Sequence, residues 1–359
     1  MIRFCPHPGR RLTTGPLVAA SIAATATAAS AQHAVISGRV LSTGTSVALS
    51  YSVVGTQPTP REQFTDADGR FIIRDLPGGR VTFSAKHVGY TPFDTTLMLR
   101  DGDTLRLDIG LSLITIELPA IQTLAKACMH PGASMARYGT ALATLFEQMR
   151  ENAERNRLLE RSYPFELFIE RTISRPEPML EARFIAIDTI ERGSARSWAY
   201  EPGKLLGRRQ IDEGVFSGTW TTITMPELAD FADERFLNSH CFDYSGVDEL
   251  DGDSLLRIDF VPAPTVHTPD IGGTLYLDRK TFQLRATIVS LVNLTKDLRR
   301  RIGGQSIRAD FREVVPGVPV LDRISSMVYP RDDIKGKIPD EPSTEEQRTL
   351  RVKFLKGKP

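Results

Sequence analysis

The histidines are the first residues of this sequence whose spacing could bind a metal. His240 is followed by Asp243 and His267 by Asp270, so each pair has the spacing His-x-x-Asp. Such His-x-x-Asp matches occur readily by chance and are weak evidence for a zinc site. None of the six histidines is followed by Glu three residues later. We therefore expect no metal at these positions and no other cofactor.

An acidic turn is the second candidate for chemistry. Asp66 and Asp68 precede Gly69, which suggests calcium, but an EF-hand loop needs Asp or Asn at its fifth position and Gly at its sixth. Arg70 and Phe71 stand there instead. A turn between two strands accounts for the same residues, because Asp accepts turn hydrogen bonds and Gly adopts positive φ angles. Both interpretations stay open, and the turn is preferred.

No nucleophile or nucleotide motif is found. The nearest match to Gly-x-Ser-x-Gly is Gly132-Ala133-Ser134-Met135-Ala136, which lies at a predicted helix start, where Ser134 serves as a cap. Neither a phosphate-binding loop nor a dinucleotide fingerprint appears. Carboxylate pairs are abundant, but a single sequence does not identify a glycosidase pair among them. We predict no catalytic residue, and a non-enzymatic protein is favoured over an unrecognised enzyme in residues 160–359.

The first 31 residues have the order of a secretory signal peptide. A basic region with three arginines precedes an uncharged run from Gly15 to Ala29, and Ala29-Ser30-Ala31 follows with small residues. This order predicts cleavage before Gln32 and export to the periplasm, the cell envelope or the medium. The run is shorter than the roughly 20 apolar residues of a membrane anchor. The Arg10-Arg11 pair leaves twin-arginine export open.

Two cysteines remain after the predicted cleavage. Cys5 lies in the removed segment, which leaves Cys128 and Cys241. An even pair in an oxidising compartment favours a disulfide. The bridge would close a long loop, for which chain-entropy models give about 4 to 5 kcal/mol of stabilisation. Two separately buried thiols are the alternative.

Charge and hydropathy exclude two classes of protein. Cleavage removes three arginines and no acids, which leaves 42 Lys and Arg against 44 Asp and Glu, a formal charge of −2. The one basic cluster, Lys296 with Arg299, Arg300 and Arg301, is interpreted as a solvated turn between strands. The mature chain therefore lacks the charge of a nucleic-acid-binding protein. No stretch after the signal peptide is apolar and long enough to span a membrane.

From His33 to Leu113, apolar and polar residues alternate. The apolar positions of two such runs are Val81, Phe83 and Ala85, and Leu105, Leu107, Ile109 and Leu111. This period of two is typical of half-buried strands. Turn residues separate the runs at 66–69, 76–79 and 101–103. Short strands with regular turns over about 80 residues predict a small antiparallel β-sandwich.

The same segment resembles a known family. It contains Ser37-Gly38-Arg39-Val40, then Thr65-Asp66-Ala67-Asp68-Gly69-Arg70-Phe71, then Leu76-Pro77-Gly78-Gly79, then Val88-Gly89-Tyr90. In order and spacing these motifs are similar to those of the carboxypeptidase regulatory-like domain family, over residues 33–113. The resemblance implies a prealbumin-like β-sandwich. It does not imply peptidase activity, because zinc carboxypeptidases keep their catalytic His-x-x-Glu pair in a separate domain.

Helical spacing replaces the strand pattern after Thr123. Apolar residues recur every three or four positions, which predicts one amphipathic helix over about 133–160, after Pro131-Gly132. We expect the apolar stripe to pack on a core. Its members are Met135, Tyr138, Leu142, Leu145, Phe146 and Met149.

Strand patterns return at Phe165 and continue toward the end of the chain. They cover 165–173, 182–190, 254–261, 273–277, 284–292, 307–314 and 349–354, with a hairpin turn from Asp278 to Thr281. The alternation predicts a larger curved antiparallel sheet that the helix covers on one face. In its hairpin pattern this sheet resembles the half-barrels of periplasmic lipoprotein-carrier proteins, a likeness of fold only.

The predicted organisation is a mainly β protein in four parts: a signal peptide (1–31), a β-sandwich (32–116), a linker and helix (117–162), and an antiparallel β-rich α+β domain (163–359). A non-enzymatic binding or envelope-assembly role is the leading hypothesis, with a protein, lipid or glycan partner. An apolar cavity in the large sheet would favour a lipid or lipopeptide carrier. Carbohydrate binding is an alternative that needs stacking aromatics. The candidates are Tyr90, Phe93, Trp198 and Trp220.

Overall fold

The structure is a computed structural model, and it describes residues 33–115, 132–175, 182–192, 199–211, 218–329 and 342–355. Some side chains within these ranges, including those of Ser134, Met135, Tyr138 and Trp220, are outside the description. The signal peptide with its predicted cleavage site before Gln32, Cys128 and Trp198 also lie outside the described residues. Within the described part of the chain, no helix combines the length and apolar character that a membrane span requires.

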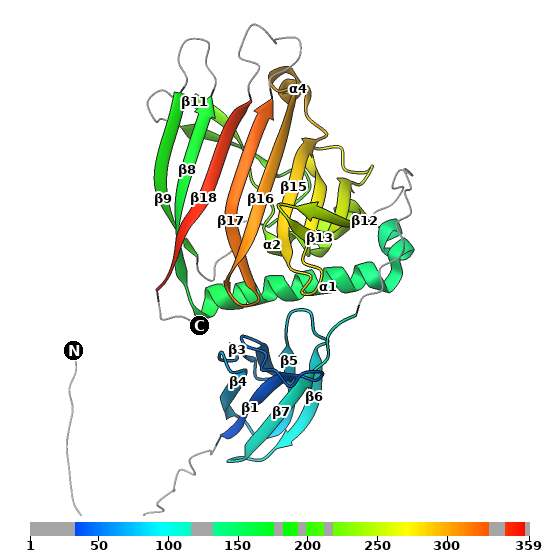
Figure 1. Cartoon of the computed structure of the whole chain (residues 1–359), viewed down its shortest axis with the longest axis vertical. Helices are drawn as coiled ribbons and strands as arrows, with labels where there is room; N and C mark the ends of the chain where they lie inside the picture. The colour runs from blue at the N-terminus through cyan, green and yellow to red at the C-terminus, as the bar shows by residue number, and fades with distance from the viewer. Residues whose placement is uncertain are drawn as a thin grey trace, which may run out of the picture. The chain divides into compact units, whose positions relative to one another are not determined.

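The first described part is a β-sandwich (Figure 1). One sheet has the strand order β4-β1-β7, and the other has the order β3-β2-β5-β6. This confirms the sandwich predicted from the alternating pattern. The strands are β1 (Ala34–Ser42), β2 (Val53–Gln57), β3 (Arg61–Phe64), β4 (Arg70–Leu76), β5 (Gly79–Lys86), β6 (Phe93–Leu99) and β7 (Thr104–Leu111).

Alternating side chains build the sandwich core. In β5, Val81, Phe83 and Ala85 are at most 3% exposed, while the polar residues between them are exposed or half-buried. Phe83 stacks on Phe71 of β4, with ring centroids 5.4 Å apart. Burial of these side chains between two sheets supplies the main favourable free energy of folding for this part.

One strand pair of the sandwich is parallel. β1 pairs with β7 from Val35 opposite Thr104 to Ser42 opposite Leu111. The prediction of antiparallel pairing throughout is therefore wrong for these two strands. A half-buried strand shows a period of two in either pairing, so the local pattern does not reveal the direction of its neighbour.

The acidic turn before β4 is held by hydrogen bonds from backbone N–H groups to the side chain of Asp66. Asp66 Oδ1 accepts hydrogen bonds from the N–H groups of Asp68 at 2.9 Å and Arg70 at 2.8 Å. Gly69 has φ +72°, which a residue with a side chain rarely adopts. The turn interpretation of these residues thus has a direct structural basis, because Asp66 closes the turn with its carboxylate.

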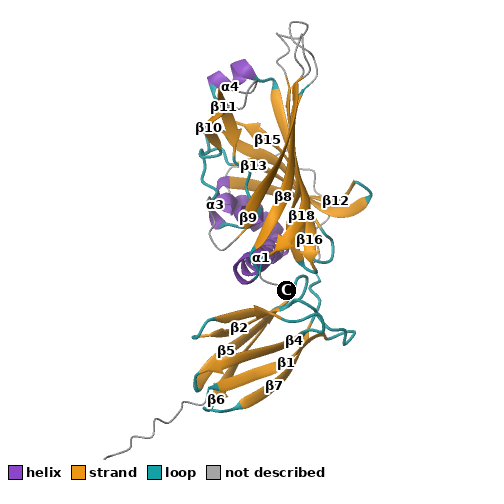
Figure 2. Cartoon of the chain, turned by 90° about the vertical axis from the view of Figure 1, so that its left-hand side faces the viewer, coloured by secondary structure: helices purple, strands orange, loops and turns teal. Residues whose placement is uncertain are grey.

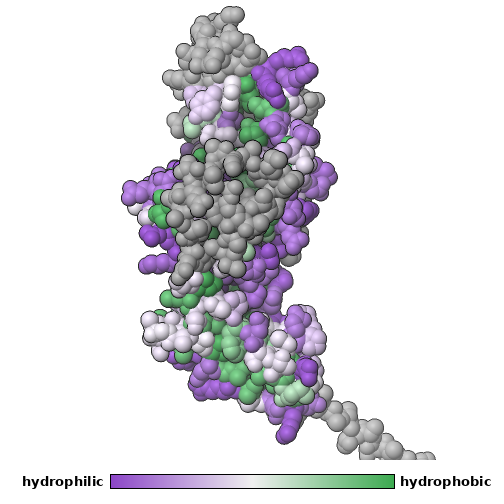
Figure 3. Space-filling model, turned by 90° about the vertical axis from the view of Figure 1, so that its right-hand side faces the viewer, coloured by the Kyte–Doolittle hydropathy of each residue, from purple (hydrophilic) through white to green (hydrophobic). Residues whose placement is uncertain are grey.

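Exposed apolar residues of the sandwich are scattered. On the face that Figure 3 shows, hydrophobic residues form small areas between hydrophilic ones. Met98, Leu113 and Val47 are 72%, 61% and 60% exposed, and they come from separate segments. Single exposed apolar side chains are usual on protein surfaces.

The second described part is built on a nine-stranded antiparallel sheet with the order β12-β13-β14-β15-β16-β17-β18-β8-β9. The last described strand, β18, lies between β17 and β8 and so joins the β8–β9 hairpin to the meander β12–β17. The predicted larger antiparallel sheet is confirmed. The strands are β8 (Phe165–Arg175), β9 (Ala182–Arg192), β12 (His240–Leu250), β13 (Asp253–Pro262), β14 (Asp270–Leu277), β15 (Leu284–Val292), β16 (Gly304–Val315), β17 (Val318–Tyr329) and β18 (Ser343–Phe354).

A long helix, α1 (Gly132–Ser162), packs on this sheet. Leu142, Leu145, Phe146 and Met149 are at most 1% exposed and belong to the main core, and Phe146 meets Phe242 of β12 edge-on at 4.8 Å. The predicted stripe is a core face at these described positions. Figure 2 shows α1 on the same side of the sheet as α3 (Glu234–Ser239) and the hairpin of β10 (Leu206–Ile211) and β11 (Gly218–Ile223). The short helix α2 (Leu228–Phe231) precedes α3.

Several elements were not predicted. One of them is strand β12, whose pattern is irregular. Its register shifts between Tyr244 and Gly246, and Gly246 has φ +92°. Strand β17 carries Pro319 near its start and lacks a regular apolar alternation. The basic cluster is a short helix, α4 (Lys296–Arg301), and not a turn, because Thr295 Oγ1 accepts from Leu298 N–H and caps it.

Candidate functional site

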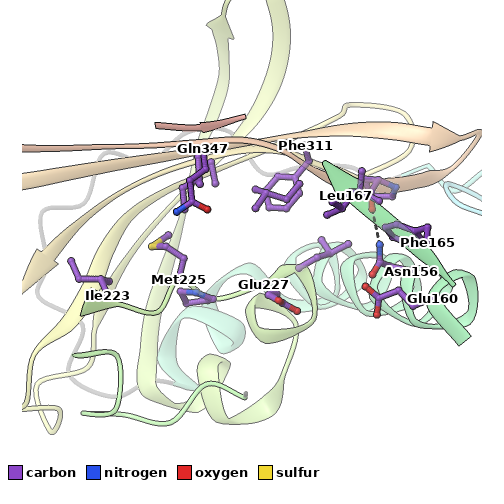
Figure 4. Close-up of a pocket in the computed structure, with 16 residues that line it drawn as sticks. Asn156, Glu160, Phe165, Leu167, Ile223, Met225, Glu227, Phe311 and Gln347 are labelled. Carbon is purple, nitrogen blue, oxygen red and sulfur yellow. Dashed lines mark hydrogen bonds between the residues drawn. The ribbon is translucent and has the colours of Figure 1, made fainter. Parts of the chain in front are cut away.

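A pocket of ≈ 270 Å³ lies between the large sheet and the layer of α1, α2 and the segment that leads into α2 (Figure 4). Of its lining side chains, twelve are apolar, two are amides and two are carboxylates. The apolar ones are Phe165, Leu167, Ile223, Met225, Pro226, Leu228, Ala309, Phe311, Pro319, Val320, Leu321 and Ile324. The polar ones are Asn156, Glu160, Glu227 and Gln347.

The sheet side of the pocket follows from strand alternation. On β16, Ala309 is 4% exposed and lines the pocket, and Phe311 lines it two residues later. The alternate residues of the same strand are Arg308 and Asp310. They form an ion pair in which Arg308 Nε donates to Asp310 Oδ1 at 2.8 Å. Alternation thus places apolar groups on the pocket face and ion pairs on the opposite face.

Strands β17 and β18 separate beside the pocket. Their backbone pairing runs from Val328 opposite Ser343 to Arg323 opposite Arg348 and stops there. Beyond this point β18 continues on β8 as far as Phe354 opposite Phe165. A separate apolar cluster contains Phe165, Leu167 and Val320, which also line the pocket. The pocket therefore sits where the sheet is not closed by continuous backbone hydrogen bonds.

The helical side of the pocket is anchored by polar contacts. Asn156 of α1 donates from Nδ2 to the carbonyl of Pro319 at 2.8 Å, which ties the helix to β17. Asp230 of α2 is fully buried, and its carboxylate accepts from the N–H groups of Tyr200 at 2.7 Å and Glu227 at 2.8 Å. Buried acceptors with full partners position their neighbours rigidly. Two walls of the pocket are thus preformed.

A second polar cluster lies in the core near α3. Tyr200 donates from its hydroxyl to Asp270 Oδ2 at 2.7 Å, and His240 Nε2 lies 3.6 Å from Asp270 Oδ1. All three residues are fully buried. Burial first, and then the hydrogen bond and charge of Asp270, raise the pKa of Tyr200 above its usual value.

The structure recombines the two His-x-x-Asp pairs of the sequence. His240 meets Asp270, which comes from the other pair, and its ring nitrogens also contact the carbonyls of Phe236 and Ile271. His267 is exposed. Among the described residues, no group of three or more His, Cys, Asp and Glu side chains is arranged to hold a metal. The cluster acts as a hydrogen-bonded part of the core.

A buried arginine on α1 is a further feature that the sequence did not indicate. Arg155 is 2% exposed, and its Nε donates to the carbonyl of Gly317 at 3.1 Å. Burial lowers the pKa of Arg155 to about 10, so the side chain is charged at neutral pH. Burial first, and then the charge of Arg155, lower the pKa of His87 to about 3. The hydrogen bond from Arg155 to Gly317 fixes the turn between β16 and β17. Because its pKa is lowered, His87 is neutral at neutral pH.

Of the predicted stacking aromatics, only Tyr90 and Phe93 have described side chains. Tyr90 and Phe93 are half-buried and pack on the sandwich core, and Tyr90 meets His87 edge-on at 5.3 Å. Trp220 lies in β11, with its side chain outside the description, and Trp198 lies outside the described residues. The pocket lining was missed, because its residues come from six separate segments that no local motif connects.

The disulfide between Cys128 and Cys241 stays a prediction. Cys241 is 4% exposed at the start of β12, and Cys128 lies outside the described residues. We expect non-reducing mass spectrometry of the mature protein to show the two peptides linked. Cys128→Ser should lower the unfolding free energy by about 4 kcal/mol, because the bridge restricts the unfolded chain. Two thiols that both react with an alkylating agent in unfolded, unreduced protein would contradict the bridge.

Chemically, the described lining of the pocket suits the binding of an apolar group. Its lining contains no Ser, Thr, Cys, His, Lys or Arg among the described residues, so a nucleophile with an adjacent base is absent from that lining. The apolar majority supports burial of an apolar group, and the four polar side chains can orient a polar end. What the arrangement offers is therefore a preformed apolar site.

Comparison with known proteins identifies the first part of the chain. Residues 35–112 match the carboxypeptidase regulatory-like domain family, which confirms the resemblance for the sandwich. No curated protein matches the chain.

Solved structures show only weak similarity. A DUF1329 family protein from Desulfovibrio piger is 9% identical, with 60% of this chain and 94% of that chain covered and a TM-score of 0.33. A LolA superfamily protein from Nitrosomonas europaea is 12% identical, with 59% and 94% covered and a TM-score of 0.29. Hydroxyquinol 1,2-dioxygenase from Pseudomonas putida is 12% identical, with 23% and 57% covered and a TM-score of 0.20. The chain thus spans less than two thirds of that enzyme, and scores this low support no inference.

Proposed function

We propose that this protein is an exported, non-enzymatic binding protein whose large sheet holds a small apolar ligand or apolar group. The pocket of ≈ 270 Å³ under β16, β17 and β8 is the observation that carries the proposal. Its volume is close to the lower end of ligand pockets, roughly 300–1,000 Å³. A lipid or lipopeptide segment is the ligand class that such a lining suits, as expected for a carrier of the cell envelope.

The arrangement around the pocket supports binding over a filled core. Hydrogen bonds fix residues of the lining, such as Asn156 Nδ2 to the Pro319 carbonyl and the Glu227 N–H to the Asp230 carboxylate. Covering the apolar surface of such a pocket with a ligand removes that surface from water, which favours binding by about 25 cal/mol per Å² of apolar surface buried. These contacts position the pocket walls, and filling the pocket with an apolar group is favourable.

The remaining parts of the proposal rest on the sequence and the family match. The carboxypeptidase regulatory-like sandwich would act as an adaptor to a partner in the envelope, and the predicted signal peptide would direct export. Carbohydrate binding stays the alternative, and its candidate aromatics are Tyr90, Phe93, Trp198 and Trp220.

Binding of prodan, a small neutral dye whose emission shifts to the blue in apolar surroundings, tests the pocket. We expect the mature protein to bind it with one saturable site. Ile324→Trp places a larger side chain in the lining and should weaken binding at least about tenfold. Met327→Trp is the matched control, because Met327 is on the same strand, is 39% exposed and does not line the pocket.

Circular dichroism and the unfolding midpoint establish that both tryptophan variants are folded, and Leu321→Trp replaces Ile324→Trp if the latter does not fold. Equal dye binding by the pocket variant and the Met327→Trp control would exclude the pocket as the binding site. Absence of any saturable dye binding by the unaltered protein would overturn the proposed function.

A further inference from the structure

Backbone pairing fixes the sheet side of the pocket. Ala309 of β16 and Ile324 of β17 lie directly opposite one another, and both line the pocket. Ala309 is also opposite Thr287 of β15, so this part of the lining belongs to three strands in one hydrogen-bonded ladder. Neighbouring strands in such a ladder lie about 4.8 Å apart. Widening this side would therefore break backbone hydrogen bonds.

Packing and a hydrogen bond fix the helical side. Phe231 of α2 is fully buried and meets Phe236 of α3 edge-on, with ring centroids 5.1 Å apart. Leu228, three residues before Phe231, lines the pocket and is 6% exposed. The hydrogen bond from Asn156 to the Pro319 carbonyl, 2.8 Å long, joins α1 to the sheet. Movement of the helical side away from the sheet would break this bond and expose buried aromatic rings.

Because both sides are fixed, the volume of the pocket limits the size of its ligand. A methylene group occupies about the volume of a water molecule in the liquid, roughly 30 Å³, so about nine methylene groups fill a pocket of ≈ 270 Å³. Figure 4 shows the lining spread along the pocket, with Ile223 and Met225 at one end and Phe165 and Leu167 at the other. An extended chain suits this arrangement better than a compact group.

We propose, on the basis of the proposed function, that the pocket buries a single alkyl chain of about nine carbons, or a ring system of the same size, and no more. A lipid with two long acyl chains would place only part of one chain inside. Ala309 sets the limit on the sheet side, because a larger side chain at this position would occupy space that the ligand needs.

A series of straight-chain alcohols measures the limit. Alcohols from hexanol to dodecanol are titrated, each below its solubility, against prodan bound to the full mature protein. Affinity should rise about fourfold per carbon, equivalent to ~0.8 kcal/mol for each buried methylene group, up to about nine carbons. Further carbons stay in water, so the gain per carbon should then fall below about 1.5-fold. The alcohols are neutral, and the ionisation of the lining carboxylates does not enter the comparison.

Ala309→Val should shorten the limit. Valine has two more carbons than alanine, and a β-branched residue suits a strand. The ratio of the affinities for nonanol and hexanol should fall from about 60-fold to about fourfold, because two methylene groups of the ligand lose their space. Ala286→Val is the matched control and should leave this ratio unchanged. Ala286 is 2% exposed on β15 and lies opposite Asp310, on the face of the sheet away from the pocket.

The outcomes separate this inference from the proposed function. If prodan binds and affinity keeps rising about fourfold per carbon through dodecanol, the size limit is overturned and the apolar site stands. If Ala309→Val binds nonanol and hexanol in the same ratio as the unaltered protein, the inference also fails. If prodan itself does not bind, the proposed function fails first. Should Ala309→Val not fold, Leu321→Ala enlarges the pocket instead and must move the limit to longer chains, or the inference is wrong.

Discussion

Gly38→Ala should destabilise the sandwich by about 3 kcal/mol or more, because the space for a side chain at this position is already filled by backbone. A Cβ on Gly38 would lie 1.7 Å from the carbonyl oxygen of Leu107 and 2.6 Å from its carbonyl carbon. Leu107 is the residue opposite Gly38 in the parallel pair of β1 and β7. The two strands would have to move apart to admit a methyl group, and the hydrogen bonds between them would be lost.

The measurement is the urea midpoint of unfolding for the mature protein, followed by far-ultraviolet circular dichroism. Gly44→Ala is the matched control, because no atom lies within 4 Å of a Cβ built there. It should change the unfolding free energy by less than about 0.5 kcal/mol. Equal effects of the two substitutions would show that the close approach of β1 and β7 is not what requires glycine at position 38.

Asp270→Ala should cost about 3 to 5 kcal/mol of unfolding free energy, because it removes the acceptor of several buried groups at once. Asp270 is fully buried; it accepts from the Tyr200 hydroxyl at 2.7 Å and the N–H of Ile271 at 2.8 Å. Without the carboxylate, the tyrosine hydroxyl is left in the core without this acceptor. Asp270→Asn keeps an acceptor oxygen and should lose less.

Asp248→Ala provides the comparison for that result. Asp248 pairs with Arg257 at 3.1 Å, and both side chains are about two fifths exposed. Ion pairs in contact with solvent contribute roughly 0 to 1 kcal/mol, so this loss should be small. If thermal or urea unfolding gave similar losses for Asp248→Ala and Asp270→Ala, the buried cluster would not have the stabilising role assigned to it.

Position 38 shows that a sequence motif can be recognised although the structural requirement for its glycine is not visible in the sequence. The sequence contains Ser37-Gly38-Arg39-Val40, and the resemblance to the carboxypeptidase regulatory-like domain family was carried in part by this run. Nothing local requires glycine there, because Gly38 lies in a regular strand. The requirement comes from Leu107, which is distant in sequence. Only the parallel pairing, which alternation does not encode, explains the glycine.

The pocket could not be predicted for a related reason. The strand that carries Ala309 and Phe311 was expected from its alternation, and the helix that carries Asn156 and Glu160 from its spacing. Their meeting depends on β18 lying between β17 and β8, a pairing of strands from opposite ends of the domain. The opening beside the pocket depends on where the pairing of β17 and β18 stops. Neither property leaves a local signal.

By itself, the sequence determined the elements whose periodicity is local. These are the sandwich strands, the stripe of Leu142, Leu145, Phe146 and Met149 on α1, and seven of the later antiparallel strands, β8, β9, β13, β14, β15, β16 and β18. Alternation and helical spacing set which side chains are buried, and turn residues such as Asp66 set where strands end. Only the tertiary structure decided which strands pair, that His240 meets Asp270, and that twelve apolar side chains enclose a pocket with two acids. Those outcomes depend on contacts between distant segments, whose free energy is gained only when the whole core is buried.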